Sequence, residues 1–278
     1  MGGVTGAGGL PGTVDEVLAA LDDVVAGALA DGDRVGYFAA IYRKVTAKVK
    51  EGIEAGFFDD GPRMERLDVT FADRYLDALR AVRSGGRPTR SWQFAFDMAR
   101  SARPVILQHL IVGINAHINL DLGIAAAETA PGADLPGLRG DFDRINEILA
   151  VLIGQVQAEI DAVSPAIHVL NWLGARNDEE VLRFSLEVAR AEAWRFATEL
   201  APLDRATWGG PIGVKDARTA MLARVVRDPG PVLCGGLLVI RAVECNDVRR
   251  VIRTLAEVPE PDLATVEARV REERAPGA

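Results

Sequence analysis

The chain has 278 residues, of which 49% are hydrophobic, 6% aromatic and 26% charged. This length fits one large domain or two small ones, and the apolar fraction excludes a disordered chain. The net charge of −8 has the wrong sign for a protein that binds the phosphate backbone of nucleic acids. No run of about 18 apolar residues occurs, so we expect no transmembrane segment. Two cysteines are too few for a disulfide framework.

The N-terminus, residues 1–12, is rich in glycine and lacks the basic start and apolar core of a signal peptide. We therefore expect a disordered leader on a cytoplasmic protein. The first helix follows at once, because Thr13 and Glu16 have the spacing of a capping box. Asp33 is placed to cap the second helix, and Pro62 stands just before the third.

Helical periodicity continues to the end of the chain, and no alternating strand pattern with hairpin turns accompanies it. One segment, 232–240, is apolar enough for either a short strand or a buried helix, and its helical neighbours favour the buried helix. The predicted helices cover residues 17–30, 37–56, 64–82, 91–100, 104–129, 141–163, 166–175, 178–200, 215–227, 231–243, 247–258 and 262–274.

These patterns predict an all-α protein, a single large bundle of about ten helices around a buried polar central helix. Glycine and proline cluster just after residue 201. We therefore predict a helical core domain over 13–201, which carries the central helix, and a C-terminal helical subdomain over 202–278 packed on that core.

The central helix, 104–129, differs from the others in composition. Between Val105 and Ala127 it has no lysine, arginine or glutamate, which a helix with one solvated face normally carries. Its aliphatic residues share one arc of the helix, and its polar residues occupy the rest. The polar residues are Gln108, His109, Asn115, His117, Asn119 and Asp121. Polar groups buried in a core must find partners there, so this helix is the candidate for either an internal hydrogen-bond network or a functional site.

His117 and Asp121 are the sharpest candidates, because the spacing i, i+4 brings an imidazole and a carboxylate within about 6 Å at Cβ. One interpretation is a divalent metal held by both side chains. The other is a His–Asp dyad, in which the carboxylate orients a general base. His109 lies about 12 Å earlier along the axis and cannot bind the same ion as Asp121.

A metal would need at least one further ligand from another helix. Asp73 and Asp77 are the first choice and are also candidate catalytic partners, because they too are spaced i, i+4. Asp143 and Asn146 come next, and His168 is the last choice. For substrate binding the candidates in the central helix are His109, Asn115 and Asn119. The candidates outside it are Tyr42, Tyr75 and Asn146, although a buried tyrosine is more often a core residue.

The segment 115–127, NAHINLDLGIAAA, resembles an uncharacterised bacterial family, frequent in actinobacteria and catalogued as domain of unknown function 5995. RLDVTFADRYLDAL, before it, and DFDRINEIL, after it, contribute to the resemblance, which extends from about Asp15 into the 250s. The resemblance implies an α-helical soluble protein and provides no activity to transfer. Its signature falls on Asn115, His117, Asn119 and Asp121.

Two functions are compatible with these patterns. The first is an enzyme that transforms a small, largely apolar molecule by hydrolysis, isomerisation or cyclisation, with His117 and Asp121 at its centre. The second is a non-catalytic helical protein that binds a ligand or a partner and uses the polar helix as an internal support. Either one is compatible with a homo-oligomer, and neither involves nucleic acid.

Overall fold

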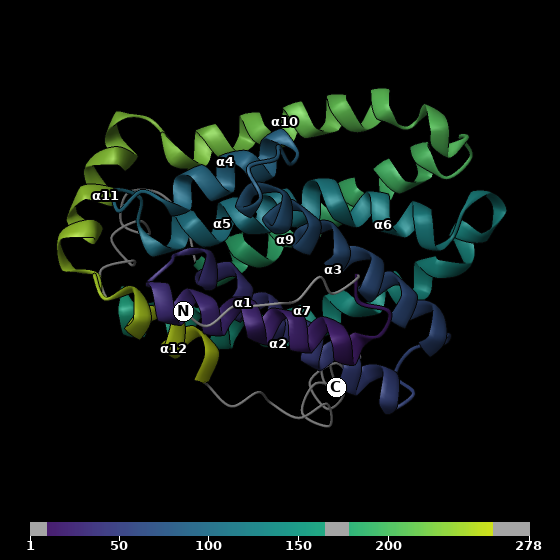
Figure 1. Cartoon of the computed structure of the whole chain (residues 1–278), viewed down its shortest axis with the longest axis horizontal. Helices are drawn as coiled ribbons and strands as arrows, with labels where there is room; N and C mark the ends of the chain where they lie inside the picture. The colour runs from purple at the N-terminus through teal and green to yellow at the C-terminus, as the bar shows by residue number, and fades with distance from the viewer. Residues whose placement is uncertain (1–9, 165–177, 258–278) are drawn as a thin grey trace, which may run out of the picture.

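The computed structural model describes residues 10–164 and 178–257 (Figure 1). Across this part of the chain the elements are helices and no strand occurs, which confirms the all-α bundle. The N-terminal helices are α1 (Val14–Asp31), α2 (Val35–Glu54), α3 (Gly61–Arg83) and α4 (Arg90–Ala99). The central helix comprises α5 (Ile106–Ala116), η1 (His117–Asp121) and α6 (Leu122–Thr129). After the short turn η2 (Gly132–Asp134) come α7 (Leu135–Val163), α9 (Asp178–Leu200), η3 (Arg205–Thr207), α10 (Gly209–Arg227), α11 (Pro231–Val243) and α12 (Val248–Glu257).

The N-terminal helices begin where the sequence predicts. The hydroxyl of Thr13 accepts from the N–H of Glu16 at 3.2 Å, and Asp33 accepts from the N–H of Val35 at 3.0 Å. These side chains satisfy N–H groups that have no partner within the first turn of the helix. The predicted leader falls mostly on residues 1–9, outside the described residues. The predicted helices 166–175 and 262–274 also lie outside them.

The central helix passes through the middle of the bundle (Figure 1). α5 contacts α2, α4 and α10, whereas η1 and α6 contact α3 and α9. By length and composition, Ile106–Thr129 is the one helix among the described residues that could cross a membrane, and most of it is buried inside the fold. A core helix of a bundle has the same properties, so this finding is weak as a sign of a membrane span.

Two glycines of the central helix allow it to approach its neighbours closely. A Cβ at Gly123 would lie 2.6 Å from the carbonyl oxygen of Ala193 on α9. A Cβ at Gly113 would lie 2.9 Å from the ring of Phe38 on α2. Both separations are shorter than van der Waals contact, so these positions require glycine.

α10 is fixed to the middle of the bundle by hydrogen bonds. The carboxylate of Asp216 accepts from the N–H groups of Arg90 and Ser91 at 2.8 and 2.9 Å, and so satisfies the N-terminus of α4. The subdomain boundary at residue 202 stays a prediction, but α10 itself packs directly on α4 and α5.

α11 corrects one expectation from the sequence. Residues 231–243 form a helix, as predicted, but the helix is not buried. Gly236 and Ile240 are its buried residues, whereas Val232 and Leu238 are 70% and 72% exposed. The reason is its place in the fold: α11 lies at the edge of the molecule (Figure 1), and only a narrow strip of it meets the core.

Candidate active site

The central helix changes geometry at the predicted site. His117–Asp121 form one π-helical turn, in which the N–H of Leu122 donates to the carbonyl of His117, five residues back. Such turns are rare within α-helices and often occur at functional sites. The turn keeps the predicted pair together, with Nδ1 of His117 3.7 Å from Oδ2 of Asp121. The structure therefore places His117 next to Asp121, as predicted, although the two residues lie in a π turn rather than an α turn.

Asp121 is held in place by two donors from other helices. Nε of Arg74, on α3, donates to Oδ1 at 2.9 Å, and the indole N–H of Trp92, on α4, donates to Oδ2 at 2.6 Å. The side chain of Asp121 is 1% exposed. A buried carboxylate needs such partners, and two donors on different oxygens fix its orientation.

His117 lies among aromatic rings. Its imidazole stacks on Phe71 with 3.5 Å between ring centroids, and it meets the ring of Tyr42 edge-on at 4.3 Å. Neither ring nitrogen makes a hydrogen bond to any described residue. Burial lowers the pKa of His117, the neighbouring Asp121 carboxylate partly opposes this, and Arg74 lowers it further. The imidazole is therefore neutral at pH 7 and able to accept a proton.

An apolar pocket of about 110 Å³ lies on one side of His117. Helices α2, α3, α5, α7 and α9 line it together with η1, and almost all of the lining side chains are aliphatic or aromatic. The polar exceptions are His117, Tyr42 and Gln157. We call this pocket the apolar slot. The hydroxyl of Tyr42 is buried and has no hydrogen-bond partner among the described residues, and burial raises its pKa, so it stays protonated.

A polar cleft of about 510 Å³ lies at Asp121. Asp73, Arg74 and Asp77, all from α3, line it together with Asp121 and Trp92. The structure thus brings the predicted carboxylates Asp73 and Asp77 into the same cleft as Asp121. Burial and the nearby Asp77 raise the pKa of Asp73 to about 6, while Asp77 accepts from Arg80 at 2.6 Å. The His117–Asp121 pair therefore separates an apolar slot from a polar cleft.

The amide side chains of the central helix face α10 instead. Nδ2 of Asn115 donates to the carbonyl of Thr219 at 2.9 Å, and Nδ2 of Asn119 donates to Oδ1 of Asn115 at 3.0 Å. Gln108 donates to the carbonyls of Val226 and Arg227 at 2.8 and 3.0 Å. These contacts favour the structural interpretation for this side of the helix, and neither the slot nor the polar cleft contains Asn115 or Asn119.

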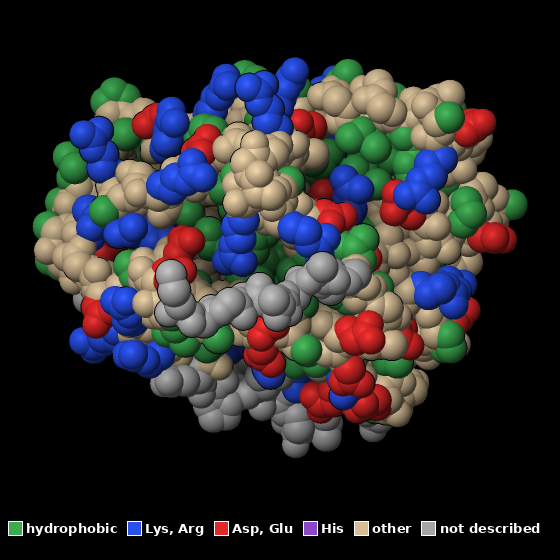
Figure 2. Space-filling model, in the orientation of Figure 1, with side chains coloured by type: hydrophobic (Ala, Val, Ile, Leu, Met, Phe, Trp, Pro, Cys, Tyr) green, Lys and Arg blue, Asp and Glu red, His purple; other side chains and the backbone are tan. Residues whose placement is uncertain are grey.

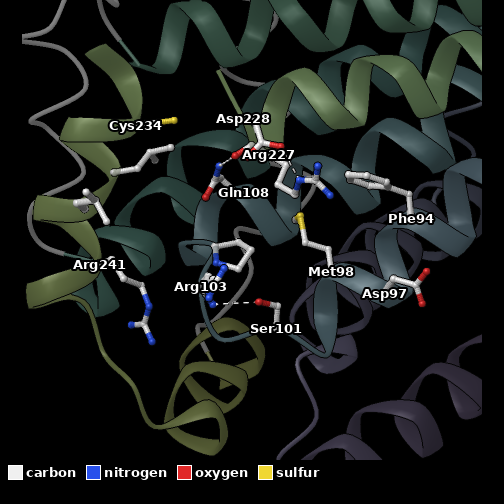
Figure 3. A pocket seen from close by; sticks show the side chains of 13 residues that line it. Phe94, Asp97, Met98, Ser101, Arg103, Gln108, Arg227, Asp228, Cys234 and Arg241 are labelled. Carbon is white, nitrogen blue, oxygen red and sulfur yellow. Dashed lines mark hydrogen bonds and ion pairs between the residues drawn. The ribbon is translucent and has the colours of Figure 1, made fainter. Parts of the chain in front are cut away.

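Gln108 also lines a second open cleft of about 640 Å³, between α4, the end of α10 and α11 (Figure 3). Two arginines that line this cleft already make hydrogen bonds within the protein. Arg227 donates to Asp228 at 2.7 Å, and Arg241 donates to the carbonyl of Ala102 at 2.7 Å. This cleft shares no lining residue with the slot.

Three other predicted residues lie apart from the slot. His109 borders a cavity of about 20 Å³ with Tyr75, and burial lowers the pKa of His109 to about 4. Tyr75 packs against the ring of Trp92 at 5.1 Å, and burial raises the pKa of its hydroxyl. Asn146, on α7, accepts from Nε of Arg190 on α9. Of the predicted tyrosines, Tyr42 is the one that reaches the slot.

The donor set does not fit a divalent metal at this pair. Among the described residues, no three His, Cys, Asp or Glu side chains are grouped around one point. Both oxygens of Asp121 already accept from Arg74 and Trp92. Of the other predicted ligands, Asp143 pairs with Arg139 at 2.6 Å, and His168 lies outside the described residues.

Sequence reasoning did not select several residues that shape the site. Arg74 and Trp92 orient Asp121, and Phe71 stacks on His117. Asp68 is a buried carboxyl group whose pKa is raised to about 7 by burial and by the charge of Glu65. A sequence shows no difference between these residues and ordinary core or surface residues, because their roles depend on contacts between different helices.

The fold and the site define a class: an all-α bundle whose buried central helix carries a His–Asp pair in a π turn. The chain belongs to a family of unknown function, DUF5995, whose sequence model matches residues 14–229. This confirms the family resemblance that the sequence indicated. The match spans the central helix and every residue that lines the slot. No curated protein and no solved structure matches the chain.

Proposed function

We propose that this protein is an enzyme that moves a proton within a small, largely apolar substrate, a reaction of the isomerase type. One observation carries the proposal: a neutral histidine with no hydrogen-bond partner among the described residues borders an apolar slot, while a fixed carboxylate lies behind it. A neutral imidazole can accept a proton, and Asp121 stabilises the imidazolium that results.

In this mechanism His117 removes a proton from a carbon next to a carbonyl group of the substrate. The electron pair of the broken C–H bond moves toward the carbonyl oxygen, and the Tyr42 hydroxyl donates a hydrogen bond to that oxygen. His117 then returns the proton to another carbon, so the reaction needs no other reactant. Asp121 holds the charged imidazole in place and remains ionised.

The character of the slot favours proton transfer over hydrolysis. Hydrolysis needs a positioned water molecule, and a water molecule in a protein is normally held by two to four polar groups. His117, Tyr42 and Gln157 are the polar side chains at this slot, and aliphatic and aromatic groups line the rest. A dry environment also strengthens the electrostatic interaction between Asp121 and a protonated His117.

The alternative is a protein that binds an apolar ligand without transforming it. The observation in its favour is the use of Gln108 and Asn115 as supports for α10, which shows that part of the polar helix has a structural role. Both functions use the same slot. They differ in whether His117 accepts a proton from the ligand after it binds.

The test uses β,γ-unsaturated methyl ketones of about six to ten carbons as probes, a length that fits the slot. The proposed reaction converts them to conjugated isomers of the same mass, and ultraviolet absorbance detects the product. We expect wild type to convert at least one probe and His117→Phe to lose about 10²–10⁴-fold in rate. Asn115→Leu is the matched control and should keep the rate. Probe binding without isomerisation by wild type would support the binding protein instead.

A further inference from the structure

The apolar slot is long and narrow. Its lining on the central helix runs from Leu107 to Ile118, which is about 16 Å at 1.5 Å per residue. On α7 it runs from Leu149 to Ile160, the same length. A volume of about 110 Å³ spread over this length leaves a thin channel.

The hydrophobic contacts show how α5 and α7 border this channel. Leu110 on α5 and Ile160 near the end of α7 belong to one hydrophobic cluster. Ile118 in η1, two turns after Leu110, and Leu152, two turns before Ile160 on α7, belong to another. The two helices therefore pass each other in opposite directions, and the slot extends between the two clusters.

The polar groups are not distributed evenly along the slot. His117 lies next to Ile118, and its ring contacts Tyr42 and Phe71. The end near Leu107 and Ile160 is bordered by aliphatic side chains, with the partly buried Gln157 one turn away on α7. A molecule lying in the slot would thus have one end next to the rings of His117 and Tyr42 and the rest against hydrocarbon.

We propose that the ligand of this slot is a single unbranched alkyl or acyl chain with an oxygen function at one end. The oxygen end lies at His117 and Tyr42, and the chain extends between α5 and α7 toward Leu107. A ring system fits poorly, because the slot extends over about three helical turns and its volume of about 110 Å³ leaves it narrow in cross-section. The placement of the oxygen end at His117 rests on the proposed function. The unbranched shape of the ligand is inferred from the dimensions of the slot alone.

The test measures binding without turnover. Purified full-length protein is titrated with straight-chain fatty alcohols of increasing length, and isothermal titration calorimetry measures each dissociation constant. Each added CH₂ that enters the slot should tighten the dissociation constant about fourfold. The gain should stop once the chain fills the slot, because further CH₂ groups remain in water. A fused-ring alcohol with the same number of carbons should bind much more weakly.

Leu107→Trp tests the position of the tail. Leu107 is only partly buried, so the larger side chain can be accommodated while it blocks the far end of the slot. We expect the chain length at which the dissociation constant stops improving, the plateau, to become shorter by several carbons. Leu238→Trp, on an exposed part of α11, is the matched control and should leave the plateau unchanged. Circular dichroism verifies that both variants fold, and Ile111→Phe, also partly buried at the slot, replaces Leu107→Trp if that variant does not fold.

The outcomes separate this inference from the proposed function. If the alcohols bind with a plateau that Leu107→Trp shifts, but wild type isomerises no ketone probe, the ligand class is supported and the isomerase is overturned. Isomerisation with no chain-length dependence, or with equal binding of the fused-ring alcohol, overturns the ligand class alone. Failure of every alcohol to bind also overturns the ligand class.

Discussion

Nδ1 of His117 lies 3.7 Å from Oδ2 of Asp121, and this same oxygen accepts the indole N–H of Trp92 at 2.6 Å. This carboxylate oxygen thus accepts a hydrogen bond from Trp92 and also faces the imidazole of His117. Protonation of His117 would strengthen its attraction to this carboxylate and favour a hydrogen bond between them. Catalytic hydrogen bonds are often long until the substrate is bound.

Removal of the indole N–H of Trp92 should lower the free energy of unfolding. Trp92→Phe keeps most of the aromatic packing but leaves one carboxylate oxygen of the buried Asp121 without its partner. We expect a loss of about 1.5–3 kcal/mol in the free energy of unfolding, measured by urea denaturation. Trp208→Phe is the matched control, because Trp208 is also buried and donates only to the neutral carbonyl of Leu203, at 3.3 Å. Equal losses in the two variants would contradict the special role of Trp92.

The sequence predicts the bundle well because helical signals are local. The capping side chain of Thr13 and the apolar periodicity depend on residues a few positions apart, and the structure confirms them. Asp33 accepts from the first N–H of α2, but the N-cap of that helix is Arg34. Burial depends on what lies against a helix, which sequence periodicity does not reveal. For this reason α11 was correctly predicted as a helix and wrongly predicted as buried.

The site was predictable in part for the same reason. His117 and Asp121 are neighbours along one helix, so their proximity follows from spacing. The π turn does not follow from spacing, because an i, i+5 hydrogen bond depends on how the neighbouring helices hold the backbone. Arg74 and Trp92 were not selected because they reach Asp121 from other helices, 47 and 29 residues away in the chain.

The histidines should make the protein sensitive to acid. Burial lowers the pKa of His109 to about 4, and it lowers the pKa of His117 as well. In the unfolded chain both titrate near 6.5, so below that pH the unfolded state binds more protons and stability falls. The slope is roughly 1.4 kcal/mol per pH unit for each histidine, down to its folded pKa.

Nuclear magnetic resonance titration of the imidazole protons between pH 8 and pH 4 measures these pKa values directly. In Asp121→Asn the pKa of His117 should fall below its wild-type value, because the carboxylate that favours the charged imidazole is gone while Arg74 remains. The His109 resonance is the internal control and should not shift. A rise in the His117 pKa would contradict the electrostatic arrangement described above.

Close contact between α6 and α9 should make Gly123 intolerant of a side chain. In Gly123→Ala the new methyl group would meet the backbone carbonyl of Ala193 at 2.6 Å, and a backbone oxygen cannot move aside easily. We expect a loss of about 1–3 kcal/mol in stability. Gly27→Ala, inside α1 with no atom within 4 Å of the added Cβ, should instead stabilise the protein by about 0.5–1 kcal/mol. Thermal unfolding of the two variants compares these opposite signs directly.

Asp68 should limit stability at high pH. Burial and the charge of Glu65 raise its pKa to about 7, compared with about 3.9 in an unfolded chain. The folded state therefore binds more protons between these values, and the contribution of Asp68 to stability is lost as the pH rises through this range. Asp68→Asn removes the charge but keeps the shape, so its advantage over wild type should grow from pH 5 to pH 8. Urea denaturation at both pH values, with the exposed Asp22→Asn as control, measures the difference. An advantage that does not change with pH would show that Asp68 ionises in the folded protein as readily as in the unfolded chain.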